Sequence, residues 1–236
     1  MTDLIPALLR RRARRAGADP LLTYYEPATA TRIELSAVTL LNWVDKTSHL
    51  LDELGVGAGD AVELALATTA PGHWVTAVWQ LACWQVGAPV VVGPGLAEPR
   101  LRVTGPDWAA ADLDDGAELV ACSLHPLGLP LPEPPPPHVT DYALEVRGQA
   151  DTYPARPPAA TALAWLDADR RLTQADLLAG AAGAPARRLV LSGTPWETAR
   201  AAVVAPLRDG GSTVLVAGGA TADQLARIRR DERAEL

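Results

Sequence analysis

Several features common in other proteins are scarce or missing here. The 236 residues include no phenylalanine, one lysine and two cysteines. No apolar run reaches the roughly 18 residues that a membrane-spanning helix needs. Cys83 and Cys122 lack CxxC spacing, which indicates two ordinary buried thiols in a reducing compartment. The N-terminal residues do not follow the order of a secretory signal, so we expect a cytoplasmic protein without a membrane span.

Positive charge is also in short supply. The net charge of −7 argues against nucleic acid as a partner, because binding to phosphates requires a positive surface. An exception is the helix predicted at 3–16, which ends in a cluster of arginines: Arg10, Arg11, Arg12, Arg14 and Arg15. Cations at a helix C-terminus are stabilised by the negative end of the helix dipole. Alternatively, they could bind a polyanion or a membrane surface.

The apolar residues alternate between the periods of strands and helices. The first half predicts a hairpin (21–25 and 31–35), a helix from the N-cap Ser36 to Gly55, and a strand–helix–strand unit (62–66, His73–Val86, 88–92). Two strands joined in this way are expected to be parallel neighbours with a right-handed crossover. The predicted fold class is therefore α/β, a mostly parallel sheet flanked by helices, in a single domain of residues 1–236.

A proline-rich connector at 124–138 interrupts this pattern, because proline has no N–H donor for a helix or central strand. A ligand for an SH3-type domain is the alternative interpretation of this segment. Beyond it, the pattern predicts strands at 143–146, 162–166, 188–191 and 213–216, and helices at 174–182, 198–207 and from Thr221 onward.

Motifs that would carry chemistry are few. The four histidines (His49, His73, His125 and His138) lack the spacing of zinc ligands, and no G-x-S-x-G motif occurs. The glycines of 55–59 follow a helix, which is the wrong context for a dinucleotide motif. We therefore predict no catalytic residue, no metal site and no cofactor. Ligands of α/β sheets bind at the carboxyl ends of strands, so Ser192, Thr194 and Trp196 are the candidates for a cofactor-binding site.

Two stretches resemble a known family. Residues 20–95 contain LLDELGVGAGDAV (50–62) and ATTAPGHWVTAVWQLACWQVGAPVVV (67–92), and residues 187–219 contain RLVLSGTP (188–195) and APLRDGGSTVLV (205–216). Their order, spacing and turn glycines are similar to the N-terminal part of the adenylate-forming superfamily, the acyl-CoA synthetase or AMP-binding enzymes. Together the stretches cover a little under half of the chain. The resemblance implies the fold of the N-terminal subdomain of these enzymes.

The sequence departs from the family where the family does its chemistry. Family members hold the phosphates of ATP with a Thr/Ser/Gly-rich loop ending in Pro-Lys-Gly, through backbone amides and the lysine. The corresponding segment here, Asp167–Arg171, has no glycine and no lysine. The family's C-terminal lid and its catalytic lysine have no counterpart, because Lys46 lies in an early helix. Family members also have a histidine in the second stretch, and the corresponding position in this chain lies near Thr198.

The resemblance and these departures together predict a catalytically degenerate homologue. Its function is expected to be that of a non-enzymatic interaction or regulatory protein, whose partner is another protein or a second copy of the chain. One alternative is a protein that binds a small molecule, either an acyl compound or a nucleotide. The other is an adenylating subunit that is completed by a partner chain. We expect Asp167–Arg171 to be a shortened, exposed connector whose carboxylates and guanidiniums satisfy one another.

Overall fold

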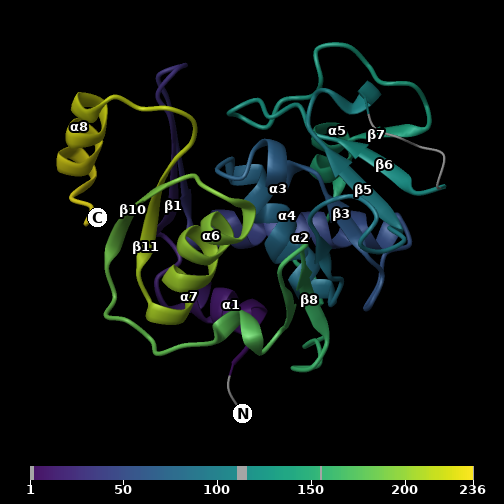
Figure 1. The fold of residues 1–236 in the computed structure, drawn as a ribbon, viewed down its shortest axis with the longest axis horizontal. Helices are drawn as coiled ribbons and strands as arrows, with labels where there is room; N and C mark the ends of the chain where they lie inside the picture. The colour runs from purple at the N-terminus through teal and green to yellow at the C-terminus, as the bar shows by residue number, and fades with distance from the viewer. Residues whose placement is uncertain (1–2, 111–115, 155, 236) are drawn as a thin grey trace.

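The structure is a computed structural model that describes residues 3–110, 116–154 and 156–235. Two sheets stand on either side of a group of helices (Figure 1). None of the described helices is long and apolar enough to cross a membrane.

The smaller sheet joins strands from both ends of the chain. Its order is β10 (Arg187–Leu191), β11 (Ser212–Val216), β1 (Pro20–Glu26) and β2 (Thr31–Ser36). The hairpin β1–β2 is antiparallel, as its sequence predicts, whereas β10, β11 and β1 are parallel. The N-terminal strands are thus completed by strands that lie almost 200 residues later.

The larger sheet has seven strands, all parallel except the last pair. Its order is β7 (Val139–Asp141), β6 (Glu118–Ala121), β5 (Leu101–Thr104), β3 (Val62–Leu64), β4 (Val90–Val91), β8 (Leu163–Leu166) and β9 (Arg171–Thr173). Val62 pairs with Val90, so β3 and β4 are the parallel neighbours that the sequence predicts. Together the two sheets confirm the predicted α/β class.

The described helices vary widely in length. They are α1 (Ile5–Arg15), α2 (Ala37–Glu53), α3 (Leu66–Thr69), α4 (Trp74–Val86), α5 (Tyr142–Gly148), α6 (Pro195–Ala199), α7 (Ala205–Asp209) and α8 (Ala222–Glu232), with 3₁₀ turns at Trp108–Ala110 and Asp176–Leu178. A π-helical turn, Arg200–Val204, joins α6 to α7. It ends two residues before Pro206, which has no N–H to donate within a regular helix.

Helix α4 is the centre of the core, and its ends follow from its sequence. Every residue from Trp74 to Gln85 is buried, and the largest apolar cluster includes residues of both sheets. The imidazole of His73 accepts a hydrogen bond from the Val75 amide and caps the helix, and Gly87 ends it with a φ of +83°. Glycine is suited to this left-handed conformation because it lacks a Cβ atom.

Two predicted elements are wrong. Residues 143–146 belong to helix α5, not to a strand, because the Asp141 carboxylate accepts the Ala143 amide (2.9 Å) and starts a helix. Residues 174–182 contain only a 3₁₀ turn, not a helix. Its Asp176 carboxylate accepts the Thr173 amide at 2.9 Å, which fixes a tight turn after β9.

Several boundaries and short strands also differ from the prediction. Strand β3 ends at Leu64, and Leu66 already begins α3. The helix predicted at 198–207 begins at Pro195. Strands β5, β6, β7 and β9 have only three or four residues each, which is too few for a periodic pattern. The connector 124–138 contains no helix or strand, in agreement with its prolines.

Candidate functional site

The segment Asp167–Arg171, which the sequence resemblance aligns with the family's phosphate loop, includes the turn between β8 and β9. The Asp167 amide donates to the Arg170 carbonyl (3.0 Å), and Asp167 Oδ1 accepts the Asp169 amide (2.8 Å). Arg170 reaches Asp167 at 3.3 Å and Asp169 at 3.7 Å. The prediction that the two carboxylates and two guanidiniums of this segment satisfy one another is confirmed for Asp167, Asp169 and Arg170, but the Arg171 side chain has no described polar contact.

The prediction that both carboxylates are exposed is wrong for Asp167. Its side chain is 13% exposed, against 81% for Asp169. Asp167 Oδ2 also accepts the indole N–H of the buried Trp165 at 2.8 Å. Burial acts to raise the pKa of Asp167, but the hydrogen bonds from Trp165 and the Asp169 amide, together with Arg170, outweigh it and lower the pKa. Asp167 is therefore a charged anchor of the hairpin.

This arrangement does not suit a triphosphate. A phosphate-binding loop needs unpaired N–H groups and a cation that converge on one point. Here the amides of Asp167 and Asp169 are already paired within the turn, and Arg170 is neutralised by carboxylates. An incoming phosphate would meet negative charge first.

The predicted candidates Ser192, Thr194 and Trp196 follow β10, where the Thr194 hydroxyl and the Gly193 amide are used by the local structure. The Gly193 amide donates to Thr198 Oγ1 at 2.9 Å, and Thr194 Oγ1 donates to the Glu197 carboxylate at 2.7 Å. Glu197 thus places its own negative charge in the first turn of α6.

Ser192 instead marks a close approach between distant segments. A Cβ atom at Gly72 would lie 2.5 Å from the Ser192 Cβ and 3.3 Å from the Ala217 Cα. Only glycine fits at this contact, where the loop before α4 touches the ends of β10 and β11.

Trp196 connects this loop to the β8–β9 turn. Its ring centroid lies 5.1 Å from that of Trp165, whose indole holds Asp167. The structure therefore brings Trp196 and Asp167 into contact with the same buried tryptophan. Ser192 and Thr194 make no described polar contact with that pair.

His73 follows Gly72 at this contact, and its position in the sequence predicted only the start of a helix and no metal site. It is 5% exposed, and its ring lies 5.0 Å from Tyr24 and 5.9 Å from Trp74. Its Nε2 atom has no hydrogen-bond partner among the described residues. Burial lowers its pKa from 6.5 to about 4. Among the described residues, no group of three or more His, Cys, Asp or Glu is arranged to hold a metal ion.

A pocket of about 460 Å³ opens at the carboxyl ends of the parallel strands β3 and β5. Its lining residues are Glu63, Ala65, Thr69, Pro94, Arg102, Thr104, Gly105, Pro106, Asp107, Ala110 and Leu124. Glu63 and Arg102 pair across adjacent strands at 3.0 Å, with both side chains largely buried. Ligands of parallel α/β sheets bind at this end of the strands. No sequence motif predicts this pocket.

Solved structures with the same fold include acyl-CoA synthetases. An acyl-CoA synthetase from Brucella canis matches with a TM-score of 0.76 and 17% identity, over 98% of this chain and 46% of its own. The N-terminal domain of FACL13 from Mycobacterium tuberculosis matches with a TM-score of 0.65 and 18% identity, over 99% of this chain and 62% of its own. The anthranilate CoA ligase AuaEII, in complex with anthranoyl-AMP, matches with a TM-score of 0.70 and 17% identity, over 97% of this chain and 48% of its own.

These likenesses confirm that the fold resembles the N-terminal part of acyl-CoA synthetases. The chain spans about half the length of the two full synthetases. No family model matches the chain. A curated relative from Mycobacterium tuberculosis, described as a TIGR03089 family protein, is 35% identical over 200 residues, which cover 83% of this chain and 80% of the relative. That identity over most of both chains shows that the chain belongs to the TIGR03089 family.

Proposed function

We propose that this chain is a catalytically degenerate, non-enzymatic member of the acyl-CoA synthetase fold that acts as an interaction or regulatory protein in the cytoplasm. The observation that carries the proposal is the β8–β9 turn. The amides of Asp167 and Asp169 and the guanidinium of Arg170 are paired within the turn, which presents the carboxylate of Asp169 to solvent.

The single lysine supports the same conclusion. Lys46 Nζ lies 2.9 Å from Asp151 and also donates to the Gln149 carbonyl. These contacts join α2 to the segment after α5. The ammonium group is therefore committed to the fold and is not available to stabilise a phosphate.

The test is pyrophosphate exchange with Mg-ATP and a panel of carboxylic acids. We expect no acid-dependent exchange above that of heat-inactivated protein, because nothing in the turn neutralises a triphosphate. A full-length acyl-CoA synthetase assayed in parallel establishes that the conditions support adenylation. Acid-dependent exchange that survives repeated purification and disappears on heating would refute the proposal.

The pocket at the carboxyl ends of β3 and β5 favours a second function, binding of a nucleotide or an acyl derivative. Thermal shift with ATP, AMP, CoA and acyl-CoAs tests it, because a ligand at 100 times its Kd stabilises the folded state by roughly 2.7 kcal/mol. Thr69 and Thr68 are adjacent on α3 and exposed, and only Thr69 lines the pocket. Thr69→Trp should abolish the shift, whereas Thr68→Trp should preserve it. A shift unaffected by both variants would place the ligand elsewhere.

A further inference from the structure

A second pocket, of about 580 Å³, lies beside the N-terminal half of α1, away from the features described above. It is lined by Asp3, Leu4, Pro6, Ala7, Arg10, Arg156, Pro157, Pro158, Ala160, Ala175 and Leu178. Most of these side chains are apolar, and the charged ones are Asp3 and two arginines. Its volume is within the range of small-molecule sites, about 300–1,000 Å³.

Arg10 is held in place by a buried polar network. Its Nη2 group donates to Asp45 at 2.8 Å, to Gln85 at 3.0 Å and to the Tyr153 carbonyl at 3.0 Å. Gln85 in turn donates to Asp45 and to Ser48, each at 2.9 Å. The Asp45 side chain is 3% exposed and that of Arg10 is 23% exposed. Residues of α2 and α4 thus hold the Arg10 guanidinium in position.

The fixed guanidinium retains donors for a ligand. All of its described hydrogen bonds use Nη2, so Nε and Nη1 have no partner among the described residues. A cation that is already positioned loses little conformational freedom when an anion binds. Arg156 adds a second guanidinium, which forms no ion pair with a described residue, whereas Asp3 is paired with Arg11.

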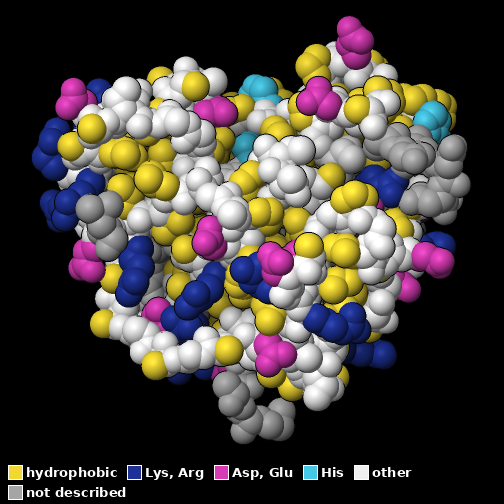
Figure 2. All heavy atoms as spheres, in the orientation of Figure 1, with side chains coloured by type: hydrophobic (Ala, Val, Ile, Leu, Met, Phe, Trp, Pro, Cys, Tyr) yellow, Lys and Arg dark blue, Asp and Glu magenta, His cyan; other side chains and the backbone are white. Residues whose placement is uncertain are grey.

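The start of α1 adds to the preference for an anion. Helix α1 has Leu4 at its N-cap, no side-chain cap and no acidic residue in its first turn. Its first N–H groups therefore lack a side-chain acceptor, and the positive end of the helix dipole lies at Leu4 and Pro6, which line the pocket. Figure 2 shows basic side chains gathered over the lower half of the molecule, around α7 and α1, although the chain is acidic overall.

We propose that the pocket between α1 and residues 156–160 binds an amphipathic anion, with its charged group at Arg10 and Arg156 and its apolar body against Pro157, Pro158 and Leu178. The charged group is a carboxylate or a phosphate monoester. No reaction is required, so this inference stands whether or not the chain forms adenylates. It also differs in place from the pocket at the ends of β3 and β5.

Calorimetric titration of the full chain with decanoate, decyl phosphate and the uncharged 1-decanol tests the proposal. Binding of decanoate or decyl phosphate, at least tenfold tighter than 1-decanol, is expected, and the tighter of the two anions identifies the charged group. If neither anion binds, or if 1-decanol binds equally well, the proposal is wrong.

Matched variants locate the site. Arg156 is exposed, so Arg156→Ala should leave the melting temperature unchanged and weaken anion binding by tenfold or more. Arg14→Ala removes an exposed arginine of α1 that does not line the pocket and should leave affinity intact. Ala160→Trp should block binding, whereas Ala159→Trp, one residue outside the lining, should not. Equal losses from Arg14→Ala and Arg156→Ala would reveal nonspecific attraction to arginines and overturn the proposal.

Discussion

At the scale of single residues, Asp167 and Asp169 have opposite environments although only one residue separates them. Asp167 receives donors from Trp165, Asp169 and Arg170, whereas the Asp169 side chain is 81% exposed and its only described contact is the 3.7 Å ion pair with Arg170. An exposed pair of this kind contributes little to stability, typically under about 1 kcal/mol. Loss of Asp167 would leave the buried Trp165 indole N–H without its acceptor.

We therefore predict different costs for the two substitutions. Asp167→Ala should lower the free energy of unfolding by about 1–3 kcal/mol, because a buried donor loses its partner. Asp169→Ala should change it by less than about 0.5 kcal/mol, as is usual for exposed sites. Urea denaturation followed by circular dichroism measures both. Equal effects would mean that the Asp167 contacts do not stabilise the hairpin.

At the scale of elements, α4 begins at a buried, uncharged imidazole. His73 caps the helix through Nδ1 and packs against Tyr24 and Trp74. Because burial lowers its pKa from 6.5 to about 4, the unfolded chain binds a proton between these values and the folded chain does not. Stability from this group is complete above pH 6.5 and is lost as the pH falls toward 4.

Replacement of His73 by Asn tests this effect, because Asn is also a good N-cap residue. Between pH 6.5 and 4, the wild-type protein should lose stability relative to His73→Asn, with a slope that approaches about 1.4 kcal/mol per pH unit. Urea unfolding at half-unit pH steps provides the comparison. The exposed His138, changed to Asn, is the control and should follow the wild type. Parallel curves for wild type and His73→Asn would contradict the prediction.

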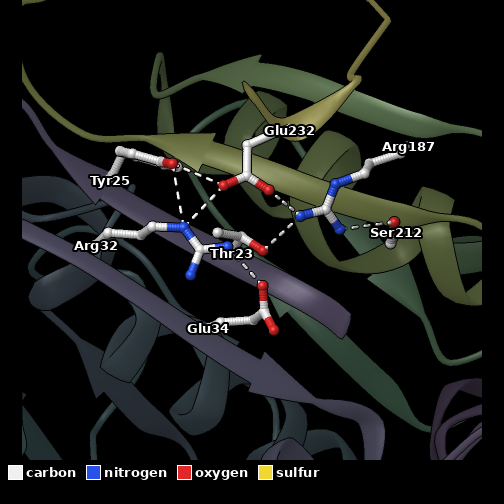
Figure 3. Close-up of polar contacts among 7 residues, drawn as sticks. All are labelled: Thr23, Tyr25, Arg32, Glu34, Arg187, Ser212 and Glu232. Carbon is white, nitrogen blue, oxygen red and sulfur yellow. Dashed lines mark hydrogen bonds and ion pairs between the residues drawn. The ribbon is translucent and has the colours of Figure 1, made fainter. Parts of the chain in front are cut away.

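At the scale of the whole molecule, a single carboxylate ties the last helix to the smaller sheet (Figure 3). The Glu232 carboxylate of α8 accepts hydrogen bonds from the Tyr25 hydroxyl at 2.6 Å and from Arg32 Nε at 2.8 Å. It also forms an ion pair with Arg187. Arg187 donates further to Thr23 at 2.9 Å. The network therefore joins β1, β2, β10 and α8, which lie at opposite ends of the sequence.

The stability that the Glu232 carboxylate contributes should be lost in acid. Burial acts to raise the pKa of Glu232, but hydrogen bonds from Arg32, Tyr25 and Arg187 outweigh it and lower the pKa from 4.5 to about 2. A lowered carboxyl pKa stabilises the fold above pH 4.5, and this stability is lost as the pH falls toward 2. Glu232→Gln should cost on the order of 2 kcal/mol at pH 7, and much less at pH 2.5.

Glu235→Gln, which changes a nearby carboxylate outside this network, is the matched control. Hydrogen exchange of the α8 amides provides a second measurement, because loss of the tie should raise exchange in α8 before it affects α4. A stability difference between wild type and Glu232→Gln that does not vary with pH would show that the charge of Glu232 is unimportant.

The elements with strong local signals could be predicted from the sequence. The β1–β2 hairpin, the Ser36 cap, α4 with its Gly87 end and the parallel pair β3–β4 are all found where their patterns indicate. The departure of Asp167–Arg171 from the family's loop sequence was also visible, because this segment has no glycine and no lysine. The short strands β5, β6, β7 and β9 and the true state of 143–146 and 174–182 escaped prediction, since side-chain contacts and turns decided them.

What the sequence by itself determined is thus most of the local elements and the absence of glycine and lysine from Asp167–Arg171, both of which depend on neighbours within a few positions. Only the tertiary structure decided which residues form sites. Arg10 meets the Tyr153 carbonyl across 143 positions, and Glu232 meets Arg32 across 200. Such pairs leave no periodic trace in a sequence, because they arise when separately encoded elements bury their apolar faces together and bring distant polar groups into the same low-dielectric interior.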